Sequence, residues 1–301
     1  MQLNILGCYS ATPRTFTNPT SQVLEINNHI FLIDCGEGTQ VELRRHKIKF
    51  NRIKHVFISH LHGDHFFGLV GLISTFRLLT READLHIYGP KGLKEIITLQ
   101  LKLSKSWTNY QLIFHELTST SSEVIFEDDK VEVRTVPLDH RVYTNGFLFK
   151  EKEKERKLDM NAVLNANIDV AYYRKLKQGF DVVNEEGIII KNESVTLKGP
   201  EPKSYAFCSD TAYNESVVPI IKDVSVLYHE STFLEKHAKL APKTKHSTAM
   251  EAAKIAKLAQ VGKLILGHYS TRYEDLNAFK TEAETIFHTV ELADDGKVFD
   301  L

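Results

Sequence analysis

Cysteine, net charge and long apolar runs are all scarce in this chain of 301 residues. Its three cysteines, Cys8, Cys35 and Cys208, are odd in number and far apart, which excludes a disulfide framework and suits a reducing compartment. We expect them to be small buried groups. No segment approaches the roughly 20 apolar residues of a membrane span, and the amino-terminal stretch lacks the basic start and apolar run of a signal peptide. The sequence therefore predicts a cytoplasmic protein without a membrane partner.

The formal net charge is only −1 at pH 7, so the chain as a whole has no electrostatic bias toward nucleic acid, and any polyanion contact must come from a local basic surface. Hydrophobic residues make up 42% and charged residues of both signs 26%. This composition is typical of a soluble globular protein and excludes disorder as the main state. The length is compatible with one large domain or two small ones.

Short apolar runs alternate with helical patterns along most of the chain. Strand-like runs occupy residues 2–6, 21–26, 29–34, 54–59, 84–89, 131–137, 144–150, 203–210, 224–230 and 262–268. Helical patterns occupy residues 38–45, 67–79, 92–102 and 247–260. The last is the clearest, with Ser247 or Thr248 as the cap and Glu251 placed to complete a capping box.

Residues 150–203 interrupt this pattern. They begin with alternating charges, show little periodicity, and hold 11 Lys plus Arg against 10 Asp plus Glu. A solvated surface insertion is the usual structure of such a charged segment. An arm that reaches a partner is the alternative, because long insertions in compact domains are often functional. Composition alone leaves both interpretations open.

The stretch SHLHGDHFFG, residues 59–68, concentrates ionisable side chains on one turn: His60, His62, Asp64 and His65. A lone histidine is usually a surface or satisfied core residue. Four such groups directly after an apolar run instead predict a metal site, because imidazole and carboxylate are ligands of Zn²⁺ and similar ions. They cannot all reach one ion with good geometry, so the pattern favours two ions with a bridging carboxylate.

Further ligands must come from distant positions. Three later strand-like runs each deliver one candidate at their carboxyl end: His140, Asp210 and His268. Taken singly each is weak evidence, since an aspartate after a strand is more often a turn residue or a cap. Loops at strand ends of a layered α/β domain converge, so together with the first motif these residues complete two coordination spheres.

With these motifs the chain resembles the metallo-β-lactamase fold family and, within it, the ribonuclease Z family of tRNA 3′-processing endonucleases. The resemblance extends over nearly the whole chain, through LGCYSATP, LIDCGEGTQ, SHLHGDHFFGL, YGPKGLKEII, CSDTAY, HESTF, KHSTAMEAAKIA and GHYSTRY. It implies an α/β (α+β) fold, a four-layer αβ/βα sandwich. The expected organisation is a single domain over residues 1–301 with an inserted arm at residues 150–203.

The resemblance also implies the roles of individual residues. One zinc ion would be held by His60, His62 and His140, and a second by Asp64, His65 and His268, with Asp210 as the bridge. The cofactor would be two Zn²⁺ per subunit, with Mn²⁺ or another divalent ion as a possible substitute. Asp64 would also act as a base on the nucleophile, His246 would pair with Glu230 beside the metals, and Asp34 would orient a histidine.

The implied reaction is metal-dependent removal of the 3′ trailer from precursor tRNA after the discriminator nucleotide. A metal-bridging hydroxide would attack phosphorus, and His246, held by Glu230, would protonate the leaving 3′-oxygen. Without the resemblance, Glu230 is better interpreted as a surface or cap carboxylate and His246 as a helix-start residue, because polar residues gather at helix starts.

The resemblance further implies a homodimer and an arm at residues 150–203 that grips tRNA. Candidate RNA contacts are Arg174, Lys175 and Lys177 in the arm, and Ser270 and Arg272 beside His268, although a solvent-facing salt bridge is equally open for Arg272. Two features depart from the family pattern: the arm lacks the Gly-Pro cluster usual near its tip, and TPRTFTN near the amino terminus lacks a Lys-x-Arg spacing. The alternatives are another dinuclear-zinc hydrolase of the same fold acting on a small phosphodiester or ester, and a non-catalytic RNA-binding protein. The second is disfavoured because every expected ligand position is filled.

Overall fold

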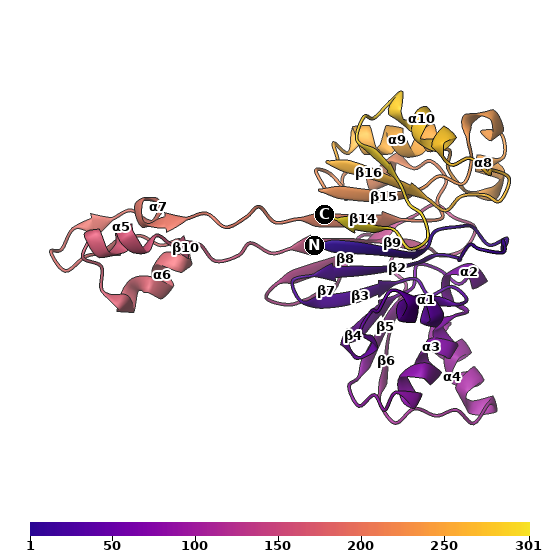
Figure 1. Ribbon diagram of the computed structural model, residues 1–301, viewed down its shortest axis with the longest axis horizontal. Coiled ribbons are helices and arrows are strands. Elements are labelled where there is room, and N and C mark those ends of the chain that lie inside the picture. Colours follow the sequence, from indigo (N-terminus) through magenta and orange to yellow (C-terminus); the bar gives the residue numbers. More distant parts are fainter. The chain divides into compact units, whose positions relative to one another are not determined.

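The computed structural model describes residues 1–301, which divide into two compact units (Figure 1). Unit 1 consists of Met1–Glu127, Val131–Lys150 and Lys203–Leu301. Unit 2 consists of Asp128–Lys130 and Glu151–Pro202. Three segments, two before residue 151 and one after residue 202, thus build unit 1.

Unit 1 contains two seven-stranded sheets. The first has the order β18 (Val298–Asp300), β1 (Gln2–Gly7), β2 (Ser21–Ile26), β3 (His29–Ile33), β4 (Ile53–Phe57), β5 (Leu85–Pro90), β6 (Leu112–Leu117). The second has the order β17 (Val290–Leu292), β16 (Lys263–Gly267), β15 (Val226–Glu230), β14 (Ser204–Cys208), β9 (Asn145–Glu151), β8 (Val131–Pro137), β7 (Val124–Glu127). Strands β3 to β6 are parallel, as are β14 to β17, so each sheet gathers several strand carboxyl ends along one edge.

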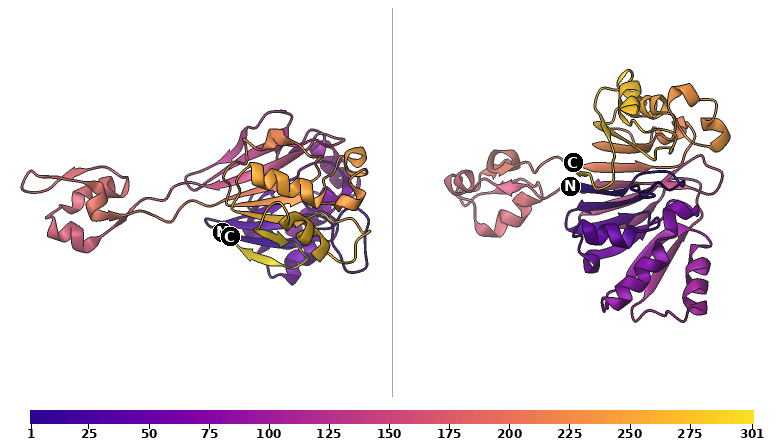
Figure 2. Two further views of the ribbon diagram at one scale, coloured as in Figure 1. Left: turned by 90° about the horizontal axis from the view of Figure 1, so that it is seen from above. Right: turned by 45° about the vertical axis from the view of Figure 1, so that its right-hand side comes forward.

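Helices cover the outer face of each sheet (Figures 1 and 2). Those on the first sheet are α1 (Thr39–Arg45), α2 (Gly63–Phe66), α3 (Leu69–Leu78) and α4 (Leu93–Leu103). Those on the second are α8 (Ala241–Thr244), α9 (Ala249–Leu258) and α10 (Asn277–Glu284). Short 3₁₀ turns lie at Phe50–Arg52, Glu215–Val217 and Glu235–His237. The predicted four-layer αβ/βα sandwich is therefore confirmed.

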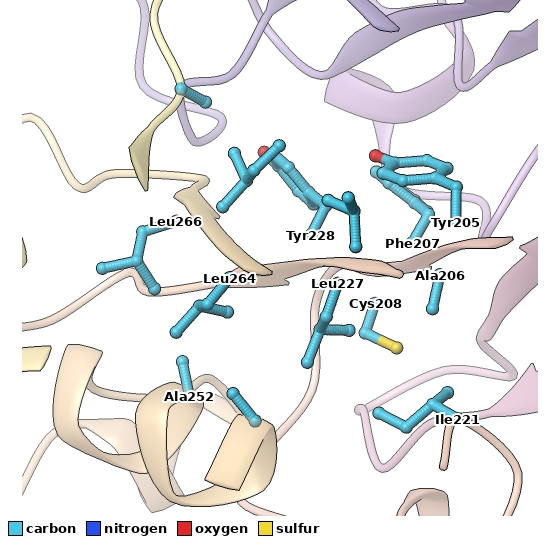
Figure 3. Close-up of a cluster of buried hydrophobic side chains, with 14 of the residues drawn as sticks. Tyr205, Ala206, Phe207, Cys208, Ile221, Leu227, Tyr228, Ala252, Leu264 and Leu266 are labelled. Atoms are coloured by element: carbon cyan, nitrogen blue, oxygen red, sulfur yellow. The ribbon is translucent and has the colours of Figure 1, made fainter. Parts of the chain in front are cut away.

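Alternating side chains of the second sheet fill two separate layers. Figure 3 shows Ala206, Cys208, Leu227, Leu264 and Leu266 on the face toward Ala252 of α9 and Ile221, and Tyr205, Phe207 and Tyr228 on the opposite face. Small alanines let α9 lie close to the sheet. The helix begins with the predicted capping box between Thr248 and Glu251. All three cysteines are buried and free, as expected.

Unit 2 has its own small elements and core. It contains β10 (Lys157–Leu158), α5 (Met160–Asn165), a 3₁₀ turn (Val170–Tyr172), α6 (Tyr173–Lys177), β11 (Val182–Val183), β12 (Ile189–Ile190), α7 (Asn192–Val195) and β13 (Thr196–Leu197). Its buried apolar side chains are Val163, Ile168, Leu176, Val182 and Val195. The insertion is therefore a folded unit and not a solvated loop.

The predicted runs correspond to observed strands and helices whose bounds differ by at most two residues. The sequence patterns do not indicate β6, β7, β17, β18 or α10. Most of β6 is half-buried, so its residues do not alternate clearly between buried and exposed, and β17 and β18 have only three residues each. None of the helices combines the length and the apolar character needed to cross a bilayer.

Candidate active site

All seven predicted metal ligands converge at the carboxyl ends of strands from both sheets. Their donor atoms form two groups within which all atoms lie within 4.8 Å of one another: His60, His62, His140 and Asp210 in one, and Asp64, His65 and His268 in the other. The first motif follows β4 and enters α2, while the remaining ligands follow β8, β14 and β16. Strand topology thus unites residues far apart in sequence.

The first group has the dimensions of a metal coordination sphere. Nδ1 of His62 lies 3.0 Å from Nε2 of His60 and 3.3 Å from Nε2 of His140. Metal–nitrogen bonds of about 2.0–2.1 Å in a tetrahedron imply nitrogen–nitrogen edges of roughly 3.4 Å. Oδ2 of Asp210 lies 3.6 Å from Nε2 of His60 and 3.8 Å from Nε2 of His140. Three imidazoles and one carboxylate therefore surround a common centre.

The second group shares the other oxygen of Asp210. Oδ1 of this carboxylate lies 3.3 Å from Nε2 of His65 and 3.2 Å from Nε2 of His268. Oδ2 of Asp64 lies 3.4 Å and 3.7 Å from the same two nitrogens. One oxygen of Asp210 thus faces each group, which is the arrangement of a bridging carboxylate.

Two ring nitrogens in this group indicate whether the residues fit a cation. Nε2 of His65 and Nε2 of His268 are buried and have no hydrogen-bond partner, a costly state for a polar atom unless a ligand satisfies it. Burial alone would lower the pKa of His65, but three nearby carboxylates raise it well above its usual value. They belong to Asp210, Asp64 and Asp34. A negative pocket with unsatisfied imidazole nitrogens fits divalent cations.

A buried carboxylate, Asp34, orients two of the histidines. Nδ1 of His65 donates to Oδ2 of Asp34 at 2.7 Å. The hydroxyl of Ser59 donates to the same oxygen at 2.8 Å and lies 3.0 Å from Nδ1 of His60. Both rings consequently present Nε2 to the centre, because a hydrogen bond at one ring nitrogen directs the other. Asp34 occupies the orienting position that the resemblance implies.

Glu230 has the corresponding position in the second sheet. Its Oε1 accepts from Nδ1 of His246 at 2.7 Å. Its Oε2 accepts from the hydroxyl of Thr232 at 2.7 Å, and that hydroxyl lies 2.9 Å from Nδ1 of His268. Glu230 has no exposed surface, so it is neither a surface nor a simple cap carboxylate. Each buried carboxylate therefore supports one histidine directly and another through a hydroxyl.

The protonation of His246 depends on this partner. Burial alone would lower its pKa, but the charge and hydrogen bond of Glu230 outweigh burial and raise the pKa of His246 to about 9. The ring centroid of His246 lies 5.1 Å from that of His140 and 5.3 Å from that of His268. A pKa raised to about 9 favours a protonated imidazole beside the ligand cluster at neutral pH.

Several site residues adopt left-handed backbone conformations at strand ends. Positive φ angles occur at Asp34 (55°), Asp210 (62°), Lys245 (58°) and His268 (59°). Such conformations are unfavourable for residues with a Cβ and concentrate at functional sites. The carbonyl of Lys245 accepts from Nδ1 of His140 at 2.8 Å. Strained turns thus aim both the ligands and the groups that hold them.

A pocket of about 390 Å³ opens onto this cluster. Its walls also include residues to which the sequence analysis assigns no role: Ser10, Ala11, Thr12, Arg141, Phe233 and Thr244. Arg141 is exposed and makes no hydrogen bond or ion pair, so its guanidinium is available to an anion. Its position directly after His140 is the one sequence signal that could have identified it.

None of the predicted RNA contacts is among the residues that line this pocket. Ser270 and Arg272 do not line this pocket; Ser270 is buried, and its hydroxyl accepts from the backbone N–H of Arg272 at 3.4 Å. Arg174, Lys175 and Lys177 are exposed on α6 of unit 2. Lys177 also lines a 410 Å³ pocket of that unit, together with Lys154, Arg156 and Lys198.

Comparisons with known proteins cover the entire chain. It is 45% identical over 294 residues to "Ribonuclease Z" of Parabacteroides distasonis, covering 98% of this chain and 97% of the relative. It is 46% identical over 299 residues to "Ribonuclease Z" of Cytophaga hutchinsonii, covering 99% and 95%. Residues 1–166 also match the family model described as Anti-Pycsar protein Apyc1, so they share that domain family.

Solved structures agree with this assignment. Human tRNase Z, short form (ELAC1), superimposes with a TM-score of 0.72 at 25% identity. The match covers 100% of this chain and 99% of the human chain. The metallo-beta-lactamase fold protein YhfI of Bacillus subtilis has a TM-score of 0.69 at 18% identity, covering 99% and 98%, a likeness of fold alone. The relatives at about 45% identity cover the chain far beyond residue 166. The chain belongs to the ribonuclease Z family and has the metallo-β-lactamase fold.

Proposed function

We propose that this protein is an endoribonuclease that removes the 3′ trailer from precursor tRNA by cutting after the discriminator nucleotide. The observation that carries the proposal is the position of Asp210 between two ligand groups, beside the His246–Glu230 pair. The ribonuclease Z relatives and the human tRNase Z structure support the choice of substrate. We also propose a cytoplasmic homodimer, as the resemblance to this family implies.

Two zinc ions are the proposed cofactors. His60, His62 and His140 would hold one, Asp64, His65 and His268 the other, and Asp210 both. Imidazole and carboxylate donors suit zinc, although Mn²⁺ also accepts them. When bound, such ions make water nucleophilic near neutral pH and offset the negative charge of a phosphodiester.

Asp64 is the proposed acceptor of the proton that the attacking water releases. Burial would raise its pKa, but His65 and His268 outweigh burial and hold the pKa of this carboxyl far below its usual value. It is therefore ionised at neutral pH. Its remaining exposed surface lies in the pocket wall, where an incoming water can reach it.

His246 is the proposed donor to the leaving 3′-oxygen. Glu230 keeps its Nδ1 occupied, so Nε2 is the atom that can hand over a proton. A pKa of about 9 keeps the ring protonated at neutral pH, as a general acid requires. Arg141, free at the pocket rim, is placed to bind a phosphate oxygen through its planar guanidinium.

Unit 2 is the proposed tRNA grip. The cations of α6, Arg174, Lys175 and Lys177, are exposed and can pair with backbone phosphates. Ser270 and Arg272 are proposed only for contacts outside the pocket.

The decisive experiment incubates the purified protein with a 3′-extended precursor tRNA, with and without a chelator, and maps both product ends. The proposal expects a tRNA ending in a 3′-hydroxyl at the discriminator, a 5′-phosphorylated trailer, and no cleavage with chelator. Cleavage of a small chromogenic phosphodiester without any cleavage of precursor tRNA would instead support a small-substrate hydrolase of the same fold. Uncleaved RNA that binds tightly would support the binding-protein alternative.

A further inference from the structure

The loop between β1 and β2 carries an aromatic side chain that the fold does not use. Phe16 is 92% exposed, the highest value among the exposed large hydrophobic side chains; the next is Leu78 at 81%. Singly exposed hydrophobic residues are common on protein surfaces, so the exposure alone decides nothing. The position of this loop is what matters, because its Ser10, Ala11 and Thr12 line the pocket that opens onto the ligand cluster.

A single carboxylate closes the base of this loop. Asp295, in the turn before β18, accepts through Oδ1 from the backbone N–H of Cys8 at 3.1 Å. Its Oδ2 accepts from the backbone N–H of Asn18 at 2.6 Å and from the Asn18 side chain at 3.0 Å. Residues at both ends of the loop thus share one half-buried acceptor, which fixes where the loop leaves the sheet.

The far end of the loop is also attached. The guanidinium of Arg14 donates to the carbonyl oxygens of Thr271 and Tyr273, the latter at 2.9 Å, in the turn that follows His268. The backbone N–H of Thr17 donates to the carbonyl of Arg14 at 3.4 Å, so Phe16 lies within a closed turn. Arg14 is the only charged residue between Tyr9 and Asn18. Nη2 of Arg14 serves these backbone carbonyls, so the loop's one cation ties the loop to the turn after His268.

We propose that Phe16 is a stacking platform for an unpaired base of the RNA next to the scissile phosphate; this deepens the proposed function and depends on it. Phe16 lies four residues beyond Thr12, a chain reach of at most about 14 Å, so only nucleotides close to the cleavage point can contact it. Unpaired RNA bases stack on aromatic side chains, and every base offers a suitable face. The loop therefore recognises the RNA through an aromatic ring on an anchored turn.

Three substitutions at this position separate stacking from apolar contact. Phe16→Ala is expected to raise KM for 3′-extended precursor tRNA by roughly 5- to 100-fold, the range that one base–aromatic stack implies, with kcat unchanged. Phe16→Trp keeps a ring and is expected to retain the wild-type KM, whereas Phe16→Leu is expected to behave like the alanine variant. Cleavage of bis(p-nitrophenyl) phosphate and thermal stability are expected to be unchanged in all three, because the side chain is exposed.

A substrate series identifies the base. Precursors with an abasic nucleotide at successive positions on either side of the cleavage point are compared between wild type and Phe16→Ala. At the stacked position, the increases in KM caused by removing the base and by removing the ring are expected not to add. Wild type and Phe16→Ala should therefore have the same KM for that abasic substrate. The ratio of the KM of Phe16→Ala to the KM of wild type is also expected to stay constant between about 50 and 200 mM salt. If Phe16 acted through a phosphate contact, this ratio would fall as salt rises.

The outcomes distinguish the two levels of the proposal. If the wild-type protein leaves precursor tRNA intact, the proposed function fails, and this inference fails with it. If wild type cleaves and Phe16→Ala keeps the same KM, or Phe16→Leu matches Phe16→Trp, only the stacking role is overturned. The stacking role is also rejected if Phe16→Ala has a higher KM than wild type for every abasic substrate.

Discussion

Glu230 and His246 form a buried pair in which Oε1 of the carboxylate accepts from Nδ1 of the ring at 2.7 Å. The other contacts of Glu230 come from the backbone N–H groups of Thr211, Thr232 and Ser247 and from the Thr232 hydroxyl. A carboxylate with this many donors is fixed in place, and it fixes the ring in turn. The pair is therefore a rigid proton-holding unit at the pocket wall.

His246→Ala is expected to leave the metal content unchanged and to lower kcat for precursor tRNA by about 10²–10⁴-fold, the usual loss for a general acid. The seven proposed ligands stay intact in this variant, so metal analysis and turnover report on separate groups. His288→Ala, at an exposed position outside the site, is the matched control and is expected to resemble wild type. Unchanged turnover in His246→Ala would remove this residue from the mechanism.

Asp210→Ala is expected to lose metal as well as activity, because one carboxylate faces both ligand groups. Removing it also leaves Nε2 of His65 and of His268 without their nearest carboxylate oxygen. Elemental analysis after dialysis against buffered zinc measures the stoichiometry. A variant that retains two ions per chain contradicts the bridging role.

Reversing the charges of α6 tests unit 2 as the tRNA grip. The triple variant Arg174→Glu, Lys175→Glu, Lys177→Glu is expected to raise KM for precursor tRNA and to leave hydrolysis of bis(p-nitrophenyl) phosphate unchanged. Each lost phosphate contact should reduce the slope of log affinity against log salt by roughly 0.7–0.9.

The matched control for this triple variant reverses three exposed lysines on or beside α4: Lys91, Lys94 and Lys102. Their reversal changes the net charge equally and is expected to affect tRNA binding much less. Equal effects of the two triple variants would reduce the role of unit 2 to long-range electrostatics.

A row of histidines on the first sheet predicts a loss of stability in acid. His29, His55, His86 and His115 occupy adjacent strands β3 to β6, and the rings of His55 and His86 stack at 5.0 Å. Burial first, and then the neighbouring histidines and Lys54, lower the pKa of His55 to about 3. The unfolded chain takes up this proton near its ordinary pKa of about 6.5. Stability from this group is therefore complete above that value and is lost as the pH falls toward 3.

His55→Phe removes this proton and keeps a ring beside Phe31 and Phe126, with which His55 already makes contact. The free energy of unfolding of the variant, relative to wild type, is expected to rise by at most about 1.4 kcal/mol for each pH unit below about 6.5. Urea unfolding at several pH values measures it. If the free energy of unfolding changes with pH in the same way in both proteins, His55 does not cause the loss of stability in acid.

The metal ligands are readable from the sequence because their chemistry is local: His60, His62, Asp64 and His65 stand on one turn. His140, Asp210 and His268 follow from one added rule, that loops at strand ends converge. The sequence does not show that His62 presents Nδ1 to the centre while His60 presents Nε2. For His60 this choice depends on the hydroxyl of Ser59 beside its Nδ1, which Asp34 holds in place.

Other parts of the site depend on tertiary packing that the chemistry of the residues alone does not reveal. Glu230 becomes a buried support only when β15 and the start of α9 come together. Arg141 and the loop after β1 enter the pocket through the way the two sheets face each other. In unit 2, a core of five apolar side chains is hidden among so many charges that its periodicity does not stand out.

The acceptor at the base of the β1–β2 loop has a consequence for how the protein is made. Ribosomal synthesis proceeds toward the carboxyl terminus, so Asp295 is added 277 residues after Asn18 and 287 after Cys8, its hydrogen-bonded partners. β18, which pairs with β1, comes later still. A nascent chain that already holds every proposed ligand therefore lacks the brace of its pocket rim, and processing competence is expected only after residues 295–301 have cleared the exit tunnel.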